Sequence, residues 1–185
     1  MAAVAHHSLQ RAGCDRDGIA LVITIMQQPQ PSTDESQREL VLTRFINAPC
    51  EKLFRAWTEP ELMKEWFTPR PYTTPIIELD LRPGGENYIL MRGPDGQEHP
   101  NRGVYLEIVR NKRLVFTDAY KAGWQPSGKP FMTAIITFEP EGEGTRYTAR
   151  ARHWSIEDKE AHEKMGFHEG WGKATDQLEA LVARL

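Results

Sequence analysis

Apolar side chains recur at steps of three and four residues through the last part of the chain, residues 155–185. The residues that share this apolar face are Phe167, Trp171, Ala174, Leu178, Leu181 and Leu185. Charged and polar residues occupy the intervening positions, which is typical of an α-helix with one buried face. Ser155, with Asp158 three residues later, forms a capping-box-like start. The pattern predicts one long helix over residues 155–185, about 40 Å in length at 1.5 Å per residue.

Three glycines, Gly166, Gly170 and Gly172, lie inside this predicted helix. Each costs about 1 kcal/mol relative to Ala, so each needs a structural or functional reason. Gly166 and Gly170 are four residues apart and share a face of the helix. Two explanations stay open. The glycines either allow close backbone packing or a kink, or they leave space for a molecule bound beneath the helix.

Short segments in which apolar and polar residues alternate dominate the chain before this helix, and they predict β-strands. The predicted strands cover residues 39–46, 76–81, 87–92, 103–109, 114–120, 131–138 and 145–154. Turn sequences such as Pro83-Gly84-Gly85 and Gly93-Pro94-Asp95-Gly96 separate neighbouring strands. Strands joined by turns of this length predict an antiparallel meander.

Two short helices are predicted between the first two strands. Pro49 suits the first turn of one helix, and Thr58 with Glu61 starts the other by capping-box logic. Pro69 and Pro71 then force an extended link. The predicted fold class is therefore α+β: about seven antiparallel strands in a curved sheet that wraps on a long C-terminal helix. A bent sheet and a straight helix leave a gap between them, and such gaps often hold apolar ligands.

Several sequence motifs are similar to those of a known superfamily. These motifs are Asn47–Pro49, Leu53–Pro60 with Trp66, Asp80–Gly85, Met91–Gly96, Arg113–Asp118 and Met165–Gly172. Together they resemble the START-like (SRPBCC) superfamily over residues 38–185, in the branch named after the activator of heat-shock-protein-90 ATPase. The resemblance implies a helix-grip fold with an internal cavity. Co-chaperones of that branch carry a further N-terminal domain that this sequence is too short to contain, which argues against chaperone stimulation here.

Residues 1–37 are predicted to be a flexible or weakly structured N-terminal extension, and residues 38–185 to form the START-like domain. The apolar run Ile19–Met26 is too short to span a bilayer. It also lacks the basic flank and cleavage site of a signal peptide. Met26 is an alternative start, so it is left open whether this extension is native.

Composition and charge narrow the function classes. Hydrophobic residues make up 39% of the chain and charged residues 26%, as in ordinary globular proteins. The net charge of -3 gives no electrostatic reason to expect nucleic acid or an anionic membrane as a partner. Cys14 and Cys50 form neither a disulfide framework nor a metal motif, so a cytoplasmic location is expected.

No catalytic or metal-binding constellation is predicted. His162 and His168 are six residues apart, which does not match the spacing of two ligands on one helix, so these histidines are expected to be solvated or to cap the helix. The sequence has no nucleophile-elbow motif and no glycine-rich phosphate loop before a helix. We therefore predict no metal, no cofactor and no catalytic residue.

The residues that line the predicted cavity follow from strand alternation and from the glycine positions. Asn87, Ile89 and Met91 are expected to face inward, because this places Arg92 in water. An inward Asn87 needs a hydrogen-bond partner, and a ligand could supply one. Core packing is the commoner alternative for each aromatic side chain. The predicted ligand-binding residues are Trp66, Asn87, Ile89, Met91, Tyr105, Tyr120, Trp124, Met165, Gly166, Gly170 and Trp171.

The sequence thus predicts a binding protein for a small apolar or aromatic molecule. One alternative is a cyclase- or dehydratase-like enzyme on polyketide-type substrates, with Asn87, His99 and Tyr120 as acid–base groups. The other is a stress-response or chaperone-accessory interaction module. A homodimer is left open, and a chaperone partner is doubtful.

Overall fold

The structure is a computed structural model that describes residues 36–185. The expectations for residues 1–35 of the N-terminal extension, including those for Ile19–Met26, lie outside the described residues.

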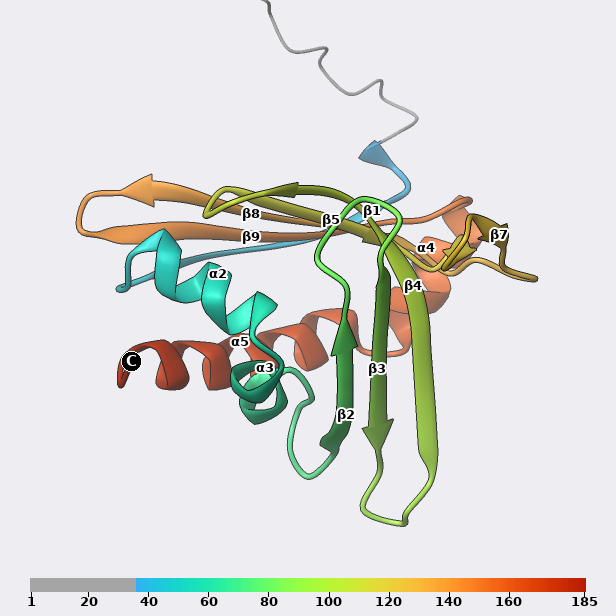
Figure 1. Cartoon of the computed structure of the whole chain (residues 1–185), viewed down its shortest axis with the longest axis horizontal. Coiled ribbons are helices and arrows are strands. Elements are labelled where there is room, and N and C mark those ends of the chain that lie inside the picture. The colour runs from blue at the N-terminus through green and yellow to red at the C-terminus, as the bar shows by residue number, and fades with distance from the viewer. Residues whose placement is uncertain (1–35) are drawn as a thin grey trace, which may run out of the picture. The chain divides into compact units, whose positions relative to one another are not determined.

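Seven strands form one antiparallel sheet in the order β1-β9-β8-β5-β4-β3-β2. Their bounds are β1 Glu39–Ile46, β2 Thr73–Leu79, β3 Glu86–Arg92, β4 Glu98–Val109, β5 Arg113–Thr117, β8 Thr133–Glu141 and β9 Gly144–Arg152. A separate ribbon pairs β6 Tyr120–Lys121 with β7 Gln125–Pro126. Figure 1 shows the sheet bending, so that β2, β3 and β4 run nearly across the direction of β1, β8 and β9. The predicted seven-stranded curved sheet and the α+β helix-grip class are confirmed.

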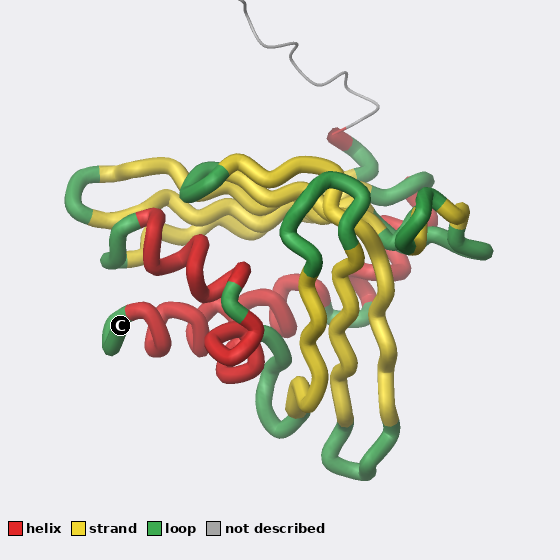
Figure 2. Tube along the Cα trace, in the orientation of Figure 1, coloured by secondary structure: helices red, strands yellow, loops and turns green. Residues whose placement is uncertain are grey.

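The helices gather on the concave side of the sheet, as Figure 2 shows. The two short helices after β1 are α2 Cys50–Thr58 and α3 Pro60–Trp66, as predicted. The start of α3 differs from the prediction, because Glu59 rather than Thr58 precedes the first helical residue. Pro60 occupies that first position, where its fixed φ fits a helix start. The Thr58 hydroxyl instead donates a hydrogen bond to the carbonyl oxygen of Phe54 at 2.7 Å.

The predicted long C-terminal helix is broken into α4 Ile156–Lys164 and α5 Phe167–Val182, so the prediction of one continuous helix is wrong. Gly166 has a φ of +95° and lies at the N-cap of α5. A residue with a Cβ pays a steric cost in this left-handed region, whereas glycine does not. Ser155 caps α4 as expected, since its hydroxyl accepts a hydrogen bond from the backbone N–H of Asp158 at 3.1 Å.

The main core fills the space between the helices and the sheet. The apolar face of α5 that helical spacing predicted is buried, as Ala174, Leu178 and Leu181 show. These residues belong to the same core cluster as Trp57 of α2 and Tyr147 of β9. Leu185, which was placed on the same face, lies beyond the end of α5 and is exposed. A buried apolar face of this kind supplies most of the stability of a helix in a protein.

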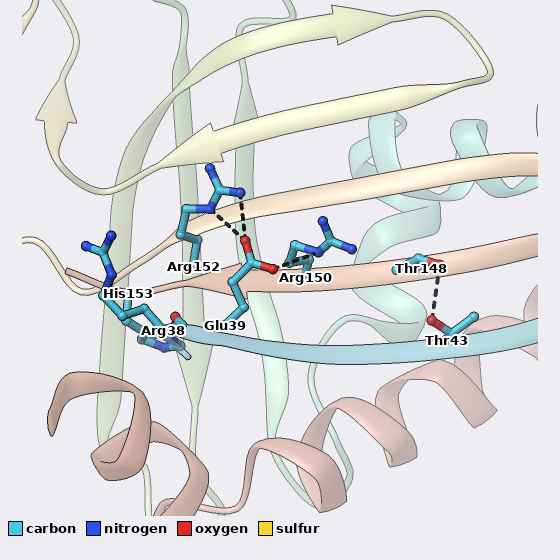
Figure 3. A network of polar contacts seen from close by, with 7 residues as sticks. All are labelled: Arg38, Glu39, Thr43, Thr148, Arg150, Arg152 and His153. Atoms are coloured by element: carbon cyan, nitrogen blue, oxygen red, sulfur yellow. Dashed lines mark hydrogen bonds and ion pairs between the residues drawn. The ribbon is translucent and has the colours of Figure 1, made fainter. Parts of the chain in front are cut away.

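The outer face of β1 and β9 carries polar side chains that pair with each other (Figure 3). The Glu39 side chain is only 6% exposed, and its carboxylate lies 2.7 Å from an Arg152 guanidinium nitrogen and 3.3 Å from Nε of Arg150. Thr43 and Thr148 share a hydrogen bond of 3.2 Å on the same strand pair. Cross-strand pairs of this kind stabilise the sheet and satisfy the buried carboxylate.

Candidate functional site

A cavity of about 380 Å³ lies between the concave face of the sheet and the N-terminal half of α5. We call it the α5 cavity. Its walls come from α2, α3, β3, β4, β5, β8, the loop before β8, the end of α4 and the first turns of α5. Met165 lines the cavity and is 74% exposed, so the cavity reaches the surface at the α4–α5 junction.

Most of the residues predicted from the sequence to bind a ligand lie on these walls. They are Trp66, Asn87, Ile89, Met91, Met165, Gly166, Gly170 and Trp171. The side chains of β3 that face inward are therefore Asn87, Ile89 and Met91, as strand alternation predicted, and Arg92 is exposed. This describes position only; that these residues bind a ligand stays a prediction.

Tyr105, Tyr120 and Trp124 do not line the cavity. Tyr105 is buried where β4 meets the β2–β3 turn, and its backbone N–H donates to the carbonyl oxygen of Gly85 at 3.0 Å. Tyr120 and Trp124 stack edge to face on the β6–β7 ribbon, with ring centroids 6.0 Å apart, and Trp124 lies over Gly84. The placement of these three residues at the cavity was wrong. Tyr105 packs against the ring of Phe116, with centroids 6.1 Å apart, and the β6–β7 ribbon carries the other two away from the cavity wall.

The two glycines that face the cavity leave open space there. A Cβ atom built at Gly166 or Gly170 would have no heavy atom within 4 Å, apart from its own immediate chain neighbours. A Cβ at Gly172 would come within 3.9 Å of the Arg44 guanidinium, and Gly172 does not line the cavity. The glycines therefore have different roles: Gly166 allows the break between the helices, and Gly170 keeps a helical turn thin above a hollow.

Aromatic rings form much of the cavity wall. Trp57 and Trp66 contact each other edge to face, with ring centroids 4.8 Å apart, and Phe167 and Trp171 lie 5.3 Å apart. The indole N–H of Trp66 donates to the carbonyl oxygen of Ala56 at 2.9 Å, so this N–H is not available to a ligand. Rings locked in this way present rigid apolar surface, which suits flat apolar molecules.

Asn87 is a buried polar residue on this apolar wall. It is 6% exposed, lines the cavity, and its side-chain amide makes no hydrogen bond with any other residue of 36–185. An inward asparagine needs a hydrogen-bond partner, and residues 36–185 supply none. A buried amide without a partner costs about 1–3 kcal/mol, so a bound molecule or water would relieve this cost.

Thr117 and Asp118 also border the cavity, but their polar atoms already have partners. The Asp118 carboxylate accepts hydrogen bonds from the backbone N–H groups of Phe131 at 2.8 Å and Met132 at 3.1 Å. Burial raises the pKa of Asp118, and these backbone hydrogen bonds oppose that shift. The Thr117 hydroxyl lies 3.3 Å from the carbonyl oxygen of Met132. These residues therefore hold the segment before β8 in place.

A buried histidine pair reaches the cavity, and the sequence analysis missed it. His162 of α4 is 8% exposed and lines the cavity, rather than being solvated or capping the helix as expected. Its Nδ1 lies 2.9 Å from Nε2 of His153, whose own Nδ1 lies 3.1 Å from the carbonyl oxygen of Arg38. Burial, together with the neighbouring His153, lowers the pKa of His162 to about 4. His162 is therefore neutral at physiological pH.

Two of the three acid–base groups considered for an enzyme lie away from the cavity. His99 pairs with Met91 in the sheet and contacts the Tyr72 ring, and Tyr120 belongs to the β6–β7 ribbon. Within residues 36–185, no group of three or more His, Cys, Asp or Glu side chains is placed to hold a metal ion. None of the helices in this part of the chain is both long and apolar enough to cross a membrane.

Comparisons with known proteins agree with this geometry. The family model described as "Activator of Hsp90 ATPase homolog 1-like protein" matches residues 47–183. The crystal structure of protein NE0264 from Nitrosomonas europaea is 43% identical, covers 80% of this chain and 96% of its own, and has a TM-score of 0.78. Protein CV1439 from Chromobacterium violaceum is 27% identical over 78% of this chain and 96% of its own, with a TM-score of 0.66. Protein Ms6760 from Mycobacterium smegmatis is 26% identical over 81% of this chain and 93% of its own, with a TM-score of 0.68. None of the curated proteins matches this chain.

Proposed function

The chain belongs to the family of activator of Hsp90 ATPase homolog 1-like proteins, and on that premise we propose that it binds a small apolar or aromatic molecule in the α5 cavity. The START-like superfamily, which contains this family, generally binds hydrophobic ligands. The observation that carries the proposal is the hollow beneath Gly166 and Gly170, where an added Cβ would meet open space. Interiors are normally close-packed, so a hollow of this size needs a reason.

The dimensions and the lining support a ligand rather than a packing defect. A volume of about 380 Å³ lies within the roughly 300–1,000 Å³ typical of small-molecule sites. An apolar wall with a few polar groups is also the usual composition of such sites. The binding residues that we propose are Trp57, Trp66, Asn87, Ile89, Met91, Met165, Gly166, Gly170 and Trp171.

The proposal assigns no catalytic residue. Of the acid–base groups considered for a cyclase or dehydratase, only Asn87 borders the cavity, and an amide side chain does not titrate. A cytoplasmic location is part of the proposal, supported by the free thiol of Cys50. No observation favours a chaperone partner or a homodimer over an isolated binding protein.

The test compares two glycine-to-leucine variants in the same helix. Gly170→Leu puts a side chain into the cavity, whereas Gly172→Leu makes the same change in helix propensity at a position that does not line it. Binding is measured by titration with the neutral fluorescent probe N-phenylnaphthylamine. We expect the unchanged protein and Gly172→Leu to bind alike, and Gly170→Leu to bind at least about tenfold more weakly because the leucine occupies the ligand space.

Equal binding by both variants would refute the α5 cavity as the binding site. Circular dichroism of both variants shows whether each is folded, so that a loss of binding can be assigned to the filled cavity.

A further inference from the structure

The hydrogen bonds of the histidine pair define which ring nitrogens carry protons. A carbonyl oxygen can only accept, so the contact between Nδ1 of His153 and the carbonyl oxygen of Arg38, at 3.1 Å, requires a proton on that nitrogen. If His153 is neutral, its Nε2 is then unprotonated and must accept. The Nδ1 of His162, 2.9 Å away, must therefore be the donor.

Neutrality of both rings follows from their surroundings. His153 is 3% exposed and His162 is 8% exposed, and within residues 36–185 neither forms an ion pair with a carboxylate. The aromatic rings in contact with His162 are those of His153, Phe131 and Phe167, and His153 is the ionisable group that lowers the pKa of His162 besides burial. A buried imidazolium without an anion is unfavourable, so the neutral pair is the stable state.

The remaining nitrogen of His162 is left as a bare acceptor. Neutral His162 with its proton on Nδ1 has a lone pair on Nε2, and this atom makes no hydrogen bond within residues 36–185. It is also not among the side-chain nitrogens and oxygens of those residues that are enclosed without a partner, so a small molecule can reach it. His162 lines the cavity, whereas His153, toward which its Nδ1 is directed, does not.

We propose that the α5 cavity selects molecules that carry a hydroxyl or N–H donor on an aromatic frame, and that Nε2 of His162 accepts this hydrogen bond. This inference rests on the proposed function, because it requires that the cavity bind a ligand. His153 acts as a positioning residue that keeps His162 in the accepting tautomer through the bond to the Arg38 carbonyl. The unpartnered amide of Asn87 provides a second polar contact from β3, which also favours a ligand that is not a pure hydrocarbon.

The test uses three probes with one frame: para-hydroxybiphenyl, para-methoxybiphenyl and biphenyl. Only the first can donate a hydrogen bond. Affinities are measured by displacement of N-phenylnaphthylamine at neutral pH. We expect the unchanged protein to bind the hydroxyl compound about tenfold more tightly than the other two, the size expected for one buried hydrogen bond.

The matched variant is His162→Phe, which keeps an aromatic ring of similar size but has no acceptor. It should lose the preference for the hydroxyl compound, so that its affinities for the three probes become similar. If the unchanged protein binds all three probes equally, the inference fails while the proposed function stands. If it binds none of them, the proposed function fails for aromatic ligands of this size, and the inference fails with it.

The tautomer is measured separately, by two-bond proton–nitrogen NMR spectra of the imidazole rings of the unliganded protein. We expect His162 of the unchanged protein to be protonated on Nδ1 alone. In a His153→Phe variant, His162 should change to the tautomer protonated on Nε2, and the variant should lose the preference for the hydroxyl compound. A proton on Nε2 of His162 in the unchanged protein would overturn the inference without any binding measurement. This spectrum needs no variant, so the test does not depend on whether His153→Phe folds.

Discussion

The two halves of α5 lie over the same sheet but meet it differently. In the C-terminal half, Leu178, Leu181 and Val182 are at most 3% exposed and pack into the main core. In the N-terminal half and at the junction with α4, Gly170 and Gly166 face open space. The difference teaches that a helix gripped by a curved sheet does not create a hollow by itself. Large aliphatic side chains close the space, and glycines leave it open.

A second contrast concerns polar groups on the two faces of the sheet. On the outer face, Glu39 is neutralised by Arg150 and Arg152 (Figure 3). On the concave side, Asn87 of β3 and His162 of α4 line the cavity, and the amide of Asn87 and Nε2 of His162 have no partner among residues 36–185. The buried carboxylate of the outer face is thus paired with cations, whereas these two polar groups beside the cavity are left for the ligand that we propose.

The largest expected effect separates the solid half of the helix from the hollow half. Leu178→Ala removes a fully buried side chain and should lower the free energy of unfolding by about 2–5 kcal/mol. Met91→Ala, on the cavity wall in β3, should cost less, because this side chain is only partly buried and already borders open space. Urea unfolding of both variants measures the difference. Equal losses would mean that the two halves are packed alike.

The next effect concerns the histidine pair and pH. The pKa of His162 is lowered to about 4 in the folded protein, from about 6.5 in the unfolded chain. As pH falls below about 6.5, the unfolded chain binds a proton that the folded protein does not, so folding stability decreases. Between about pH 7 and pH 5 we expect a loss of about 1–2 kcal/mol.

The pKa values of Glu59 and Glu141 are lowered by hydrogen bonds from Arg55 and Arg146, which moves the titration of these two carboxyls away from this window. His162→Phe should reduce the pH dependence of the urea midpoint in the same window. A variant that is as pH-sensitive as the unchanged protein would assign the effect to another group.

The smallest effect distinguishes the two glycines by the sign of the stability change. Gly166→Ala forces a Cβ into a backbone with φ of +95° and should cost about 1–2 kcal/mol. Gly170→Ala lies in regular helix with free space for its methyl group, and it should stabilise the protein by up to about 1 kcal/mol. Thermal unfolding measures both. A loss at Gly170 would contradict the open space beneath it.

Much of the fold could be predicted from the sequence, because it depends on local periodicity. Alternation placed β1 at residues 39–46, and it selected Asn87, Ile89 and Met91 as the inward side of β3. Helical spacing identified the buried face of α5 through Ala174, Leu178 and Leu181. Each of these predictions uses only residues close together in the chain, where a period of two or of 3.6 fixes which side chains share a face.

The candidate site was harder to predict, because its residues meet across long separations in the chain. Tyr120 and Trp124 were chosen as large aromatics near a cavity mouth, but their own ribbon directs them elsewhere. His162 was dismissed because its spacing from His168 is wrong for a helix pair. Its actual partner, His153, lies before the turn that leads from β9 into α4. No local pattern contains that pairing.

By itself, the sequence determined the order of strands and helices, the inward faces and the position of three unusual glycines. Only the tertiary structure decided what those glycines do. Gly166 and Gly170 are the same residue in the same predicted helix, and Gly166 ends a helix while Gly170 spans a cavity. The reason is physical. The periodicity of the sequence indicates which side of a helix or strand a residue lies on. Whether that side contacts other side chains or open space depends on segments such as β3 and α3, which come together only in the folded chain.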